Sequence, residues 1–416
     1  MPKGAWLSKP QEHLGPIGLI ILLVAGSLAC PISLDMYTPA IPQMTTFFDT
    51  DATTVNATLF GYFLFFTISM LIFGPLSDKF GRKPILLLGT VMFTIAGALC
   101  AISTTIEMLI TARAIQALGG GAMNAVVNAI VKDTFLPEKR ELALSAIQVM
   151  FLLGPVIAPL AGAFILMGSN WRMIFWVLSG FGLLCLALVL LFQETLPIKE
   201  RYVGTLAGSI GQLAVVAKNR GFTIFLTVTA LFSLPFMAYI AAASHIYITF
   251  FGLSEIEYSL YFSSAALFTA AGPFIWLLAS RFVSARRFTT IMLILAVLSG
   301  VAMLVVGQST PWFFCLTILI FIMIESCIRP YTTNILLSQH QDEAGATSSL
   351  INVFHNVACT LGMALAVLPW SNYIIGIGVL IIVSIIIAIL TWIMLLRSHI
   401  PLFGIKGEDP VGIWRD

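Results

Sequence analysis

The sequence predicts an all-α membrane protein with twelve transmembrane helices arranged as two six-helix bundles. Three observations lead to this fold class: the composition, the spacing of the apolar stretches and the distribution of positive charge. Of the 416 residues, 59% are hydrophobic and 10% are charged, and the mean hydropathy is +1.00. Soluble domains carry about 25% charged residues, so the composition excludes a soluble globular protein.

Apolar stretches recur about every 30–35 residues along the chain. Each exceeds the ~20 residues that cross ~30 Å of hydrocarbon as a helix. Helices are expected because lipid satisfies no backbone polar group, so the segment must satisfy its own. We expect twelve spans near residues 15–41, 53–76, 84–103, 107–131, 141–167, 172–193, 222–250, 257–281, 287–307, 312–337, 346–369 and 373–396.

The positive charges predict that both termini lie on the cytoplasmic side. With the N-terminus inside, the cytoplasmic segments hold 18 of the 21 Lys and Arg residues. The opposite loops hold only Arg172, while Arg113 and Arg329 fall inside spans. This asymmetry follows the positive-inside rule, and an odd number of spans would break it. Because topology explains the basic residues, we expect no nucleic-acid binding.

The longest polar connection, residues 194–221, divides the spans into six and six. We therefore expect an N-terminal six-helix bundle over residues 1–193, a cytoplasmic linker over 194–221 and a C-terminal six-helix bundle over 222–416. The middle of the linker is weakly apolar and suits a helix on the membrane surface. Two similar halves are typical of a transporter with a central site between them.

The loop after the second span reads GPLSDKFGRKPILL, residues 74–87. Gly74 permits a close helix approach and Gly81 permits a tight turn. Asp78, at a helix end, can pair with Arg82 or with an opposing helix N-terminus. The spacing G-x-x-x-D-[KR]-x-G-[KR]-[KR] is more specific than that of an ordinary basic loop.

The fifth span contains GPVIAPLAG, residues 154–162. Pro155 and Pro159 each remove a helical hydrogen bond. Gly154 and Gly162 let a neighbouring helix approach closely. The stretch therefore predicts a kinked, tightly packed helix.

These stretches together resemble the major facilitator superfamily over essentially the whole chain. The loop at 74–87 resembles its signature loop, and GPVIAPLAG is similar to its antiporter motif. ARAIQALGGG (112–121) resembles R-x-x-Q-G-x-G, with Ala117 where Gly is usual. LDMYTPAIP (34–42) resembles the DMYLPALP of the bicyclomycin resistance, or Bcr/CflA-like, drug exporters. AYIAAASHIYITFFGLS (238–254) also resembles that group, with His245 where Pro is common.

The resemblance implies proton-driven export of small molecules by alternating access from a bacterial cytoplasmic membrane. It implies no cofactor beyond the proton gradient, and we expect a functional monomer. It assigns gating to Gly74, Asp78, Gly81 and Arg82, conformational or proton linkage to Arg113 and Gln116, and a proton-leak barrier to Gly154, Pro155, Pro159 and Gly162. Ser280 stands where the second half would repeat the signature Asp, so any latch must be asymmetric.

Asp35 is the only Asp, Glu, Lys or Arg between Glu12 and Asp49. An ionisable group at bilayer depth costs at least ~2.5–3 kcal/mol and usually faces the protein interior or a wet cavity. A carboxylate partly removed from water can exchange a proton near neutral pH and release it when a cationic drug binds. The alternative is that Asp35 caps the outer end of its span. Some related exporters carry a second carboxylate eight places earlier, where this chain has Ser27.

Glu325 lies near the middle of the tenth span, and Arg329 follows at i+4, so the two can pair along one helix face. The pair is either a self-neutralising structural feature or a dipolar patch that contacts substrate. We expect Asp35 and Glu325 as candidates for proton coupling. The expected substrate cavity comprises Asp35, Tyr37, Tyr239, His245, Glu325, Arg329, Phe354 and His355.

Two function classes compete with drug export. A dedicated carrier of a polar metabolite, by export or symport, is favoured by Ser27 and by the buried ion pair. A membrane enzyme would need a reactive constellation, and the sequence holds no HExxH, GxSxG or phosphate loop. For this reason we expect no enzyme activity. We also expect no metal site, because the six cysteines are scattered singly.

Overall fold

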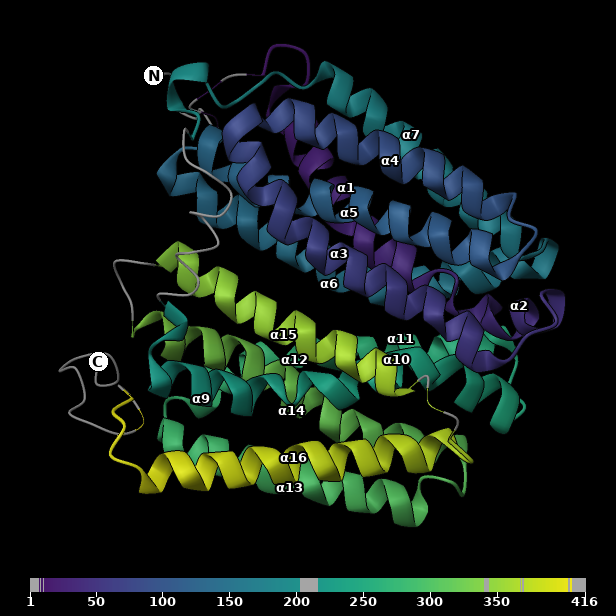
Figure 1. Ribbon diagram of the computed structural model, residues 1–416, viewed down its shortest axis with the longest axis vertical. Coiled ribbons are helices and arrows are strands. Elements are labelled where there is room, and N and C mark those ends of the chain that lie inside the picture. The colour runs from purple at the N-terminus through teal and green to yellow at the C-terminus, as the bar shows by residue number, and fades with distance from the viewer. Residues whose placement is uncertain are drawn as a thin grey trace. The chain divides into compact units, whose positions relative to one another are not determined.

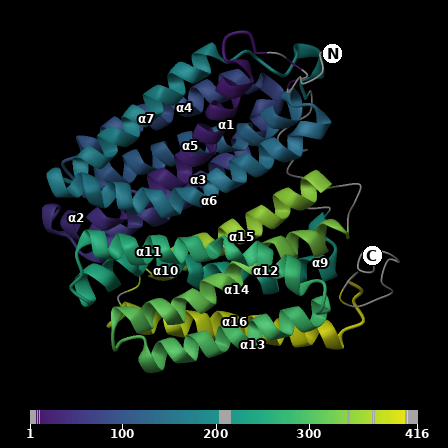
Figure 2. The same cartoon turned by 180° about the vertical axis from the view of Figure 1, so that it is seen from behind.

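The computed structural model describes residues 7, 9, 11–202, 216–339, 344–366, 368, 370–402 and 405 (Figures 1 and 2). Within these residues, twelve helical stretches are long and apolar enough to cross a bilayer. This confirms the predicted all-helical fold and its twelve spans. The surface helix expected in the middle of the linker falls on residues 203–215, outside the described residues.

The chain forms two compact units. The first comprises Met1–Leu206 and Ser254–Ser263, and the second comprises Ala207–Leu253 and Ser264–Asp416. The short segment joins the first unit because its side chains bond there. The hydroxyl of Ser259 donates to the Pro159 carbonyl at 3.0 Å, and that of Ser263 donates to the Val156 carbonyl at 2.6 Å.

The helices of the first unit are α1 (Gly15–Asp35), η1 (Thr38–Ala40), α2 (Ile41–Phe47), α3 (Ala52–Phe80), α4 (Arg82–Ala101), α5 (Ile106–Thr134), α6 (Pro137–Gly168), α7 (Trp171–Leu191), η2 (Ile198–Glu200) and the first part of α11 (Glu255–Thr269). Those of the second unit are α9 (Arg220–Ala230), α10 (Ser233–Ser244), η3 (His245–Phe250), the rest of α11, α12 (Ala271–Ala279), α13 (Ala285–Val306), α14 (Pro311–Leu337), α15 (Ala344–Ala366) and α16 (Tyr373–Arg397).

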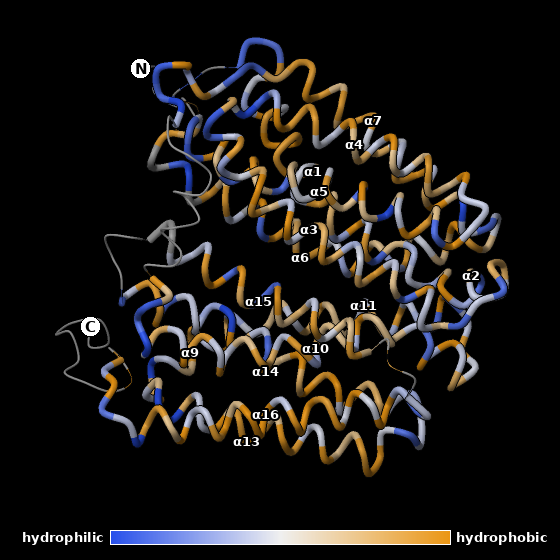
Figure 3. Tube along the Cα trace, viewed as in Figure 1, coloured by the Kyte–Doolittle hydropathy of each residue, from blue (hydrophilic) through white to orange (hydrophobic). Residues whose placement is uncertain are grey.

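Many apolar side chains of the described spans are exposed on the protein surface. Exposed large hydrophobic side chains recur along most of them, and α13 and α16 are hydrophobic over most of their length (Figure 3). Such a surface would be an aggregation liability in water but matches a hydrocarbon surrounding. Several helices begin at a capping side chain in a polar loop. At the start of α3, for example, the side chain of Asp51 accepts from the Thr54 N–H at 2.8 Å.

Three spans are interrupted within the bilayer-length stretch. The first span was predicted to end near residue 41 but continues to Phe47, broken between α1 and α2 by η1. The seventh changes from α10 to the π-helix η3 at His245. The eighth is divided at Ala270 between α11 and α12. Irregular backbone at such depth is tolerated only where protein or a wet cavity covers it.

The connection between the second and third spans is shorter than the sequence predicted. We expected a polar loop between the spans ending at 76 and starting at 84. The structure instead extends α3 to Phe80 and begins α4 at Arg82, so that Gly81 alone separates them. Gly81 has φ +107°, a backbone conformation that glycine adopts without the steric cost of a Cβ.

The predicted close packing of the fifth span is present. Helix α1 packs against α5, α6 and α7 in the first unit (Figures 1 and 2). A Cβ added to Gly154 would lie 2.9 Å from the Cβ of Pro31, and one added to Gly162 would overlap the carbonyl oxygen of Met36. Gly162 of α6 therefore supports the turn that follows Asp35.

We predict that Gly162→Ala destabilises the protein, because the obstructing atom is backbone and cannot move as a side chain would. The expected loss is about 1–3 kcal/mol, the usual cost of overpacking, measured as a lower Tm for detergent-solubilised protein. Gly168→Ala is the matched control, since a Cβ at Gly168 of the same helix meets nothing within 4 Å of the described atoms. Equal Tm values for both variants would contradict the packing argument.

Candidate functional site

Asp35 is the last residue of α1 and is 3% exposed. Its backbone carbonyl accepts from the Thr38 hydroxyl at 2.8 Å, and Thr38 in turn accepts from the Tyr258 hydroxyl at 2.9 Å. These bonds hold the backbone of the turn but leave the carboxylate free. Among the described residues, none donates a hydrogen bond to the Asp35 carboxylate or forms an ion pair with it. An ionised carboxylate so placed is costly unless a proton or a cationic ligand neutralises it.

Arg113 of α5 is fully buried beside the same end of α1. Its Nη1 donates to Ser33 Oγ at 2.8 Å and to Gln116 Oε1 at 2.7 Å. The guanidinium carbon lies 4.4 Å from the ring centre of Tyr37 and 4.2 Å from that of Tyr62. Ring faces attract cations, by about 2 kcal/mol or more when desolvated. With the Phe175 ring at 5.7 Å, three aromatic rings and two polar side chains surround this cation, and no carboxylate of the described chain pairs with it.

One residue of the first unit that was expected to line the cavity, Tyr37, differs from a simple cavity lining. Tyr37 is fully buried, and its hydroxyl lies 2.8 Å from Thr58 Oγ1, so it supports Arg113 rather than presenting a free surface. The Nε and Nη2 of Arg113 and the Nε2 of Gln116 are buried without a partner in the described chain. Buried donors of this kind are usually satisfied by water or ligand.

Arg82, predicted to gate, is buried between two carboxylates at the start of α4. It pairs with Asp78 through Nη1 and with Asp133 through Nε at 2.8 Å, and Nη1 also donates to Ser77 Oγ at 2.7 Å. The predicted Asp78–Arg82 pair is therefore present. Asp133 was not predicted, because its position at the end of the fourth span carries no local signal. The expected close approach at Gly74 is absent, since an added Cβ there meets nothing within 4 Å of the described atoms.

Glu194 is a second residue that the sequence did not indicate. Its Oε1 accepts from the backbone N–H of Arg82 at 3.0 Å, and its Oε2 accepts from that of Lys83 at 3.1 Å. Oε1 also accepts from the N–H of Thr195 and Leu196, each at 2.9 Å. A carboxylate at a helix N-terminus is favourable because it meets unpaired N–H groups and the positive end of the helix dipole. A sequence feature that could have pointed to Glu194 is its position as an acidic residue directly after the sixth span.

The second unit buries a polar cluster on α10, α14 and α15. Glu325 is 4% exposed, and its Oε1 accepts from Arg329 Nε at 3.1 Å, which gives the predicted i, i+4 pair. Ser233 Oγ lies 3.1 Å from Glu325 Oε1 and 3.1 Å from Nδ1 of His355. Arg329 Nη2 lies 3.8 Å from Cys359 Sγ. The structure thus brings together three expected residues and adds Ser233 and Cys359.

Other expected residues of the second unit make separate contacts. His245 begins η3, is 6% exposed and stacks on Tyr373 with ring centres 5.7 Å apart. Tyr239 is buried, with its ring 6.1 Å from that of Phe314. Phe354 is partly buried on α15. The structure does not place these three side chains in the Glu325 cluster.

A sequence profile of the Major Facilitator Superfamily matches residues 23–363. The chain belongs to this superfamily. The matched residues include the turn at Asp35, helix α5 with Arg113, the Asp78–Arg82 pair and the Glu325 cluster. The chain is therefore a transporter of the major facilitator superfamily.

Three relatives illustrate its place in the superfamily. An uncharacterized MFS-type transporter, YdgK of Bacillus subtilis, is 27% identical over 81% of this chain and 85% of that protein. A bicyclomycin resistance protein homolog of Haemophilus influenzae is 27% identical over 58% of this chain and 62% of that protein. A chloramphenicol resistance protein of Pseudomonas aeruginosa is 30% identical over 60% of this chain and 58% of that protein. The predicted resemblance to drug exporters of the bicyclomycin resistance type is confirmed.

A solved structure shows the same fold. The peptide transporter POT in complex with sulfate superposes with a TM-score of 0.73 at 17% identity, over 94% of this chain and 97% of that one. At this identity the likeness concerns the fold alone.

The two halves of this transporter differ in their signature regions, as expected from Ser280. The hydroxyl of Ser280 donates to the Leu277 carbonyl at 2.9 Å. Arg281, Arg286 and Arg287 are exposed, and none forms an ion pair within the described part of the chain. The Asp78–Arg82–Asp133 arrangement around the buried Arg82 side chain thus has no counterpart in the described second unit.

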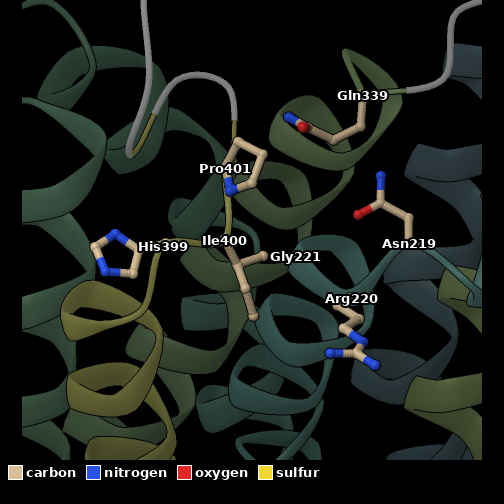
Figure 4. Close-up of a pocket in the computed structure, with 7 residues that line it drawn as sticks. All are labelled: Asn219, Arg220, Gly221, Gln339, His399, Ile400 and Pro401. Atoms are coloured by element: carbon tan, nitrogen blue, oxygen red, sulfur yellow. The ribbon is translucent and has the colours of Figure 1, made fainter.

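A cavity of about 450 Å³ opens at one end of the second unit. Figure 4 shows its lining, which comes from the start of α9, the end of α14 and the segment after α16: Asn219, Arg220, Gly221, Gln339, His399, Ile400 and Pro401. The cavity lies at helix ends and contains none of the residues expected to bind substrate. The transporter's candidate chemistry therefore lies in the buried clusters and not in this surface cavity.

We predict that Glu194→Ala lowers the Tm of the transporter by several degrees, because the first N–H groups of α4 lose their acceptor. Loss of an N-terminal cap costs about 0.5–2 kcal/mol. The matched control is Glu200→Ala in the same segment. Among the described residues its carboxylate pairs only with Lys9, at 3.7 Å on an exposed surface, an interaction of small value. The account is wrong if thermal unfolding in detergent shows the same shift for both variants.

Proposed function

We propose that this transporter exports amphipathic small molecules, including drugs, in exchange for protons. Drug export is supported by the names of two relatives, which are resistance proteins for bicyclomycin and chloramphenicol. These relatives do not favour the alternative of a dedicated carrier for a polar metabolite. The energy source is the proton gradient, and the protein acts as a monomer.

The observation that carries the proposal is the buried, unpartnered carboxylate of Asp35. A protonated Asp35 is neutral and needs no counter-charge. An ionised Asp35 needs one, and a cationic substrate supplies it. Because one carboxylate cannot serve a proton and a cation at once, binding of either expels the other, and this competition is what exchange requires. Glu325 is the second candidate carrier, in the other unit.

We also propose roles for the remaining expected residues, and the contacts support them. Arg113 of α5 bonds both Gln116 of the same helix and Ser33 of α1, which lies two residues before Asp35. A change in the protonation of Asp35 therefore affects Arg113 and Gln116 through this end of α1. Asp78 and Arg82 gate, with Gly81 shaping the turn and Gly74 in the helix before it. Gly154, Pro155, Pro159 and Gly162 form the barrier to proton leak by keeping α6 tight against α1. We place Tyr239, His245, Arg329, Phe354 and His355 in the substrate-binding region.

We also propose the orientation and the compartment. Both termini and the linker 194–221 between an N-terminal bundle (1–193) and a C-terminal bundle (222–416) are cytoplasmic. The positive-inside distribution of Lys and Arg supports this orientation. The membrane is the bacterial cytoplasmic membrane.

We predict that energised inverted vesicles containing the wild-type transporter release protons from their lumen when tetraphenylphosphonium, a lipophilic cation, is added. Asp35→Asn abolishes this release, because its side chain can neither bind a proton nor neutralise a cation. Recovery of a fluorescent pH probe measures the flux, and Glu325→Gln is measured in parallel.

Asp51→Asn is the matched control for this measurement. Hydrogen bonds from the side chain and the backbone N–H of Thr54 hold the pKa of Asp51 below its ordinary value, so Asp51 stays ionised at neutral pH and exchanges no protons there. Asparagine can also cap α3. Unchanged release in Asp35→Asn would contradict the proposal and leave Asp35 as a cap of its helix end.

A further inference from the structure

Ser233 of α10 bridges an acid and a base in the second unit. Its Oγ lies 3.1 Å from Glu325 Oε1 on α14 and 3.1 Å from His355 Nδ1 on α15. Ser233 is fully buried, and Glu325 and His355 are each 4% exposed. Helices α10 and α15 lie side by side in both views (Figures 1 and 2), so this contact is part of the packed unit.

The hydrogens of this chain of groups can be placed by counting donors. An ionised Glu325 only accepts, and a serine hydroxyl has one hydrogen. Ser233 therefore donates to Glu325, and His355 must donate to Ser233 from Nδ1–H. The neutral imidazole then presents Nε2 as a bare acceptor. That atom is buried and has no partner in the described chain, although buried polar atoms are normally satisfied.

A second arrangement uses the same heavy-atom positions with every bond reversed. A protonated Glu325 donates to Ser233 Oγ, Ser233 donates to His355 Nδ1, and His355 carries its hydrogen on Nε2. The two arrangements differ by one proton. The heavy atoms need not move between them, which is the property of a proton wire.

We propose that His355 and Ser233 form a relay that delivers a proton from His355 Nε2 to the carboxylate of Glu325. A proton binds at Nε2, the Nδ1–H proton passes to Ser233 Oγ, and the Ser233 hydroxyl proton passes to Glu325 Oε1. One N–H bond forms and one breaks on the ring, one O–H bond forms and one breaks on Ser233, and one O–H bond forms on Glu325. Release in the reverse order restores the starting arrangement. The inference rests on the proposed role of Glu325 as a proton carrier.

Arg329 explains why delivery needs a defined route. It pairs with the same Glu325 oxygen at 3.1 Å, and its side chain is 46% exposed, whereas that of Glu325 is 5% exposed. The cation is therefore the more exposed partner of the pair, and its charge repels a hydronium ion that approaches the carboxylate. Ser233 contacts Glu325, and His355 contacts Ser233; both are neutral groups in the starting arrangement. The other ionisable groups of the described chain that interact electrostatically with Glu325 or His355 are Cys327 and Cys359, on α14 and α15.

The test measures the rate at which Glu325 takes up a proton. The purified full-length transporter in lipid vesicles receives a rapid drop in pH, and the infrared C=O band of protonated Glu325, identified by its loss in Glu325→Gln, is followed in time. We expect Ser233→Ala and His355→Gln to slow the growth of this band by about 10²-fold, the usual contribution of a positioned proton-transfer group. Its final amplitude at low pH reports that the protein is folded and the acceptor intact.

Two variants control for packing. Ser233→Thr keeps the hydroxyl and should restore a rate near that of wild type. His399→Gln replaces another histidine of the same unit, one that lines the surface cavity after α16 together with no residue of the Glu325 cluster, and should leave the rate unchanged. Wild-type rates in Ser233→Ala or in His355→Gln overturn the relay, and either variant decides alone if the other fails to fold.

The outcome also separates the relay from the proposed function. If Glu325→Gln removes no infrared band, Glu325 takes up no proton, and both the relay and the role of Glu325 are wrong. Exchange at Asp35 is measured independently by the vesicle assay and survives that result. If the band is present but forms at wild-type speed in the relay variants, only the relay fails.

Discussion

An ionised side chain at bilayer depth costs at least about 2.5–3 kcal/mol unless something compensates it, and this constraint organises the polar interior of the transporter. Arg82 is compensated by two carboxylates, and Glu325 by Arg329. Arg113 is compensated by aromatic ring faces and by hydrogen bonds to Ser33 and Gln116. Asp35 alone among these groups lacks a partner in the described chain. This lack of a partner is the observation on which we base the proposal that exchange takes place at Asp35.

The backbone around Asp35 is arranged so that the carboxylate stays uncompensated without the turn collapsing. Helix α1 stops at Asp35, and Thr38 bonds the freed carbonyl rather than the side chain. At Gly162, α6 lies so close to the carbonyl of Met36 that a side chain would not fit between them. Gly154 and Gly162 therefore hold α6 close to the end of α1 that carries Asp35. Arg113 is tied to the same end of α1 through Ser33, so the turn, α5 and α6 share one set of contacts.

The sequence predicted the fold because hydropathy alone determines which segments can cross a bilayer, and it predicted Asp35, Arg113, Glu325 and Arg329 because charges stand out in apolar surroundings. It missed Ser233, Asp133 and Glu194 for the opposite reason. A serine in an apolar helix is unremarkable, and carboxylates near loops are common, so their roles exist only through tertiary contacts with residues 50 or more positions away. The loop length at Gly81 was also wrong, because a polar sequence can continue a helix when buried partners satisfy its charges.

The most direct test of the central claim is proton release from purified transporter in detergent, in weakly buffered solution, when tetraphenylphosphonium is added. No membrane potential or transport cycle is involved, so the measurement reports competition at the binding site itself. We expect a pH indicator to detect proton release from wild-type protein and none from Asp35→Asn, and we expect Asp51→Asn to release protons as wild type does. Equal release from Asp35→Asn and wild type would contradict the claim that the proton and the cation compete for Asp35.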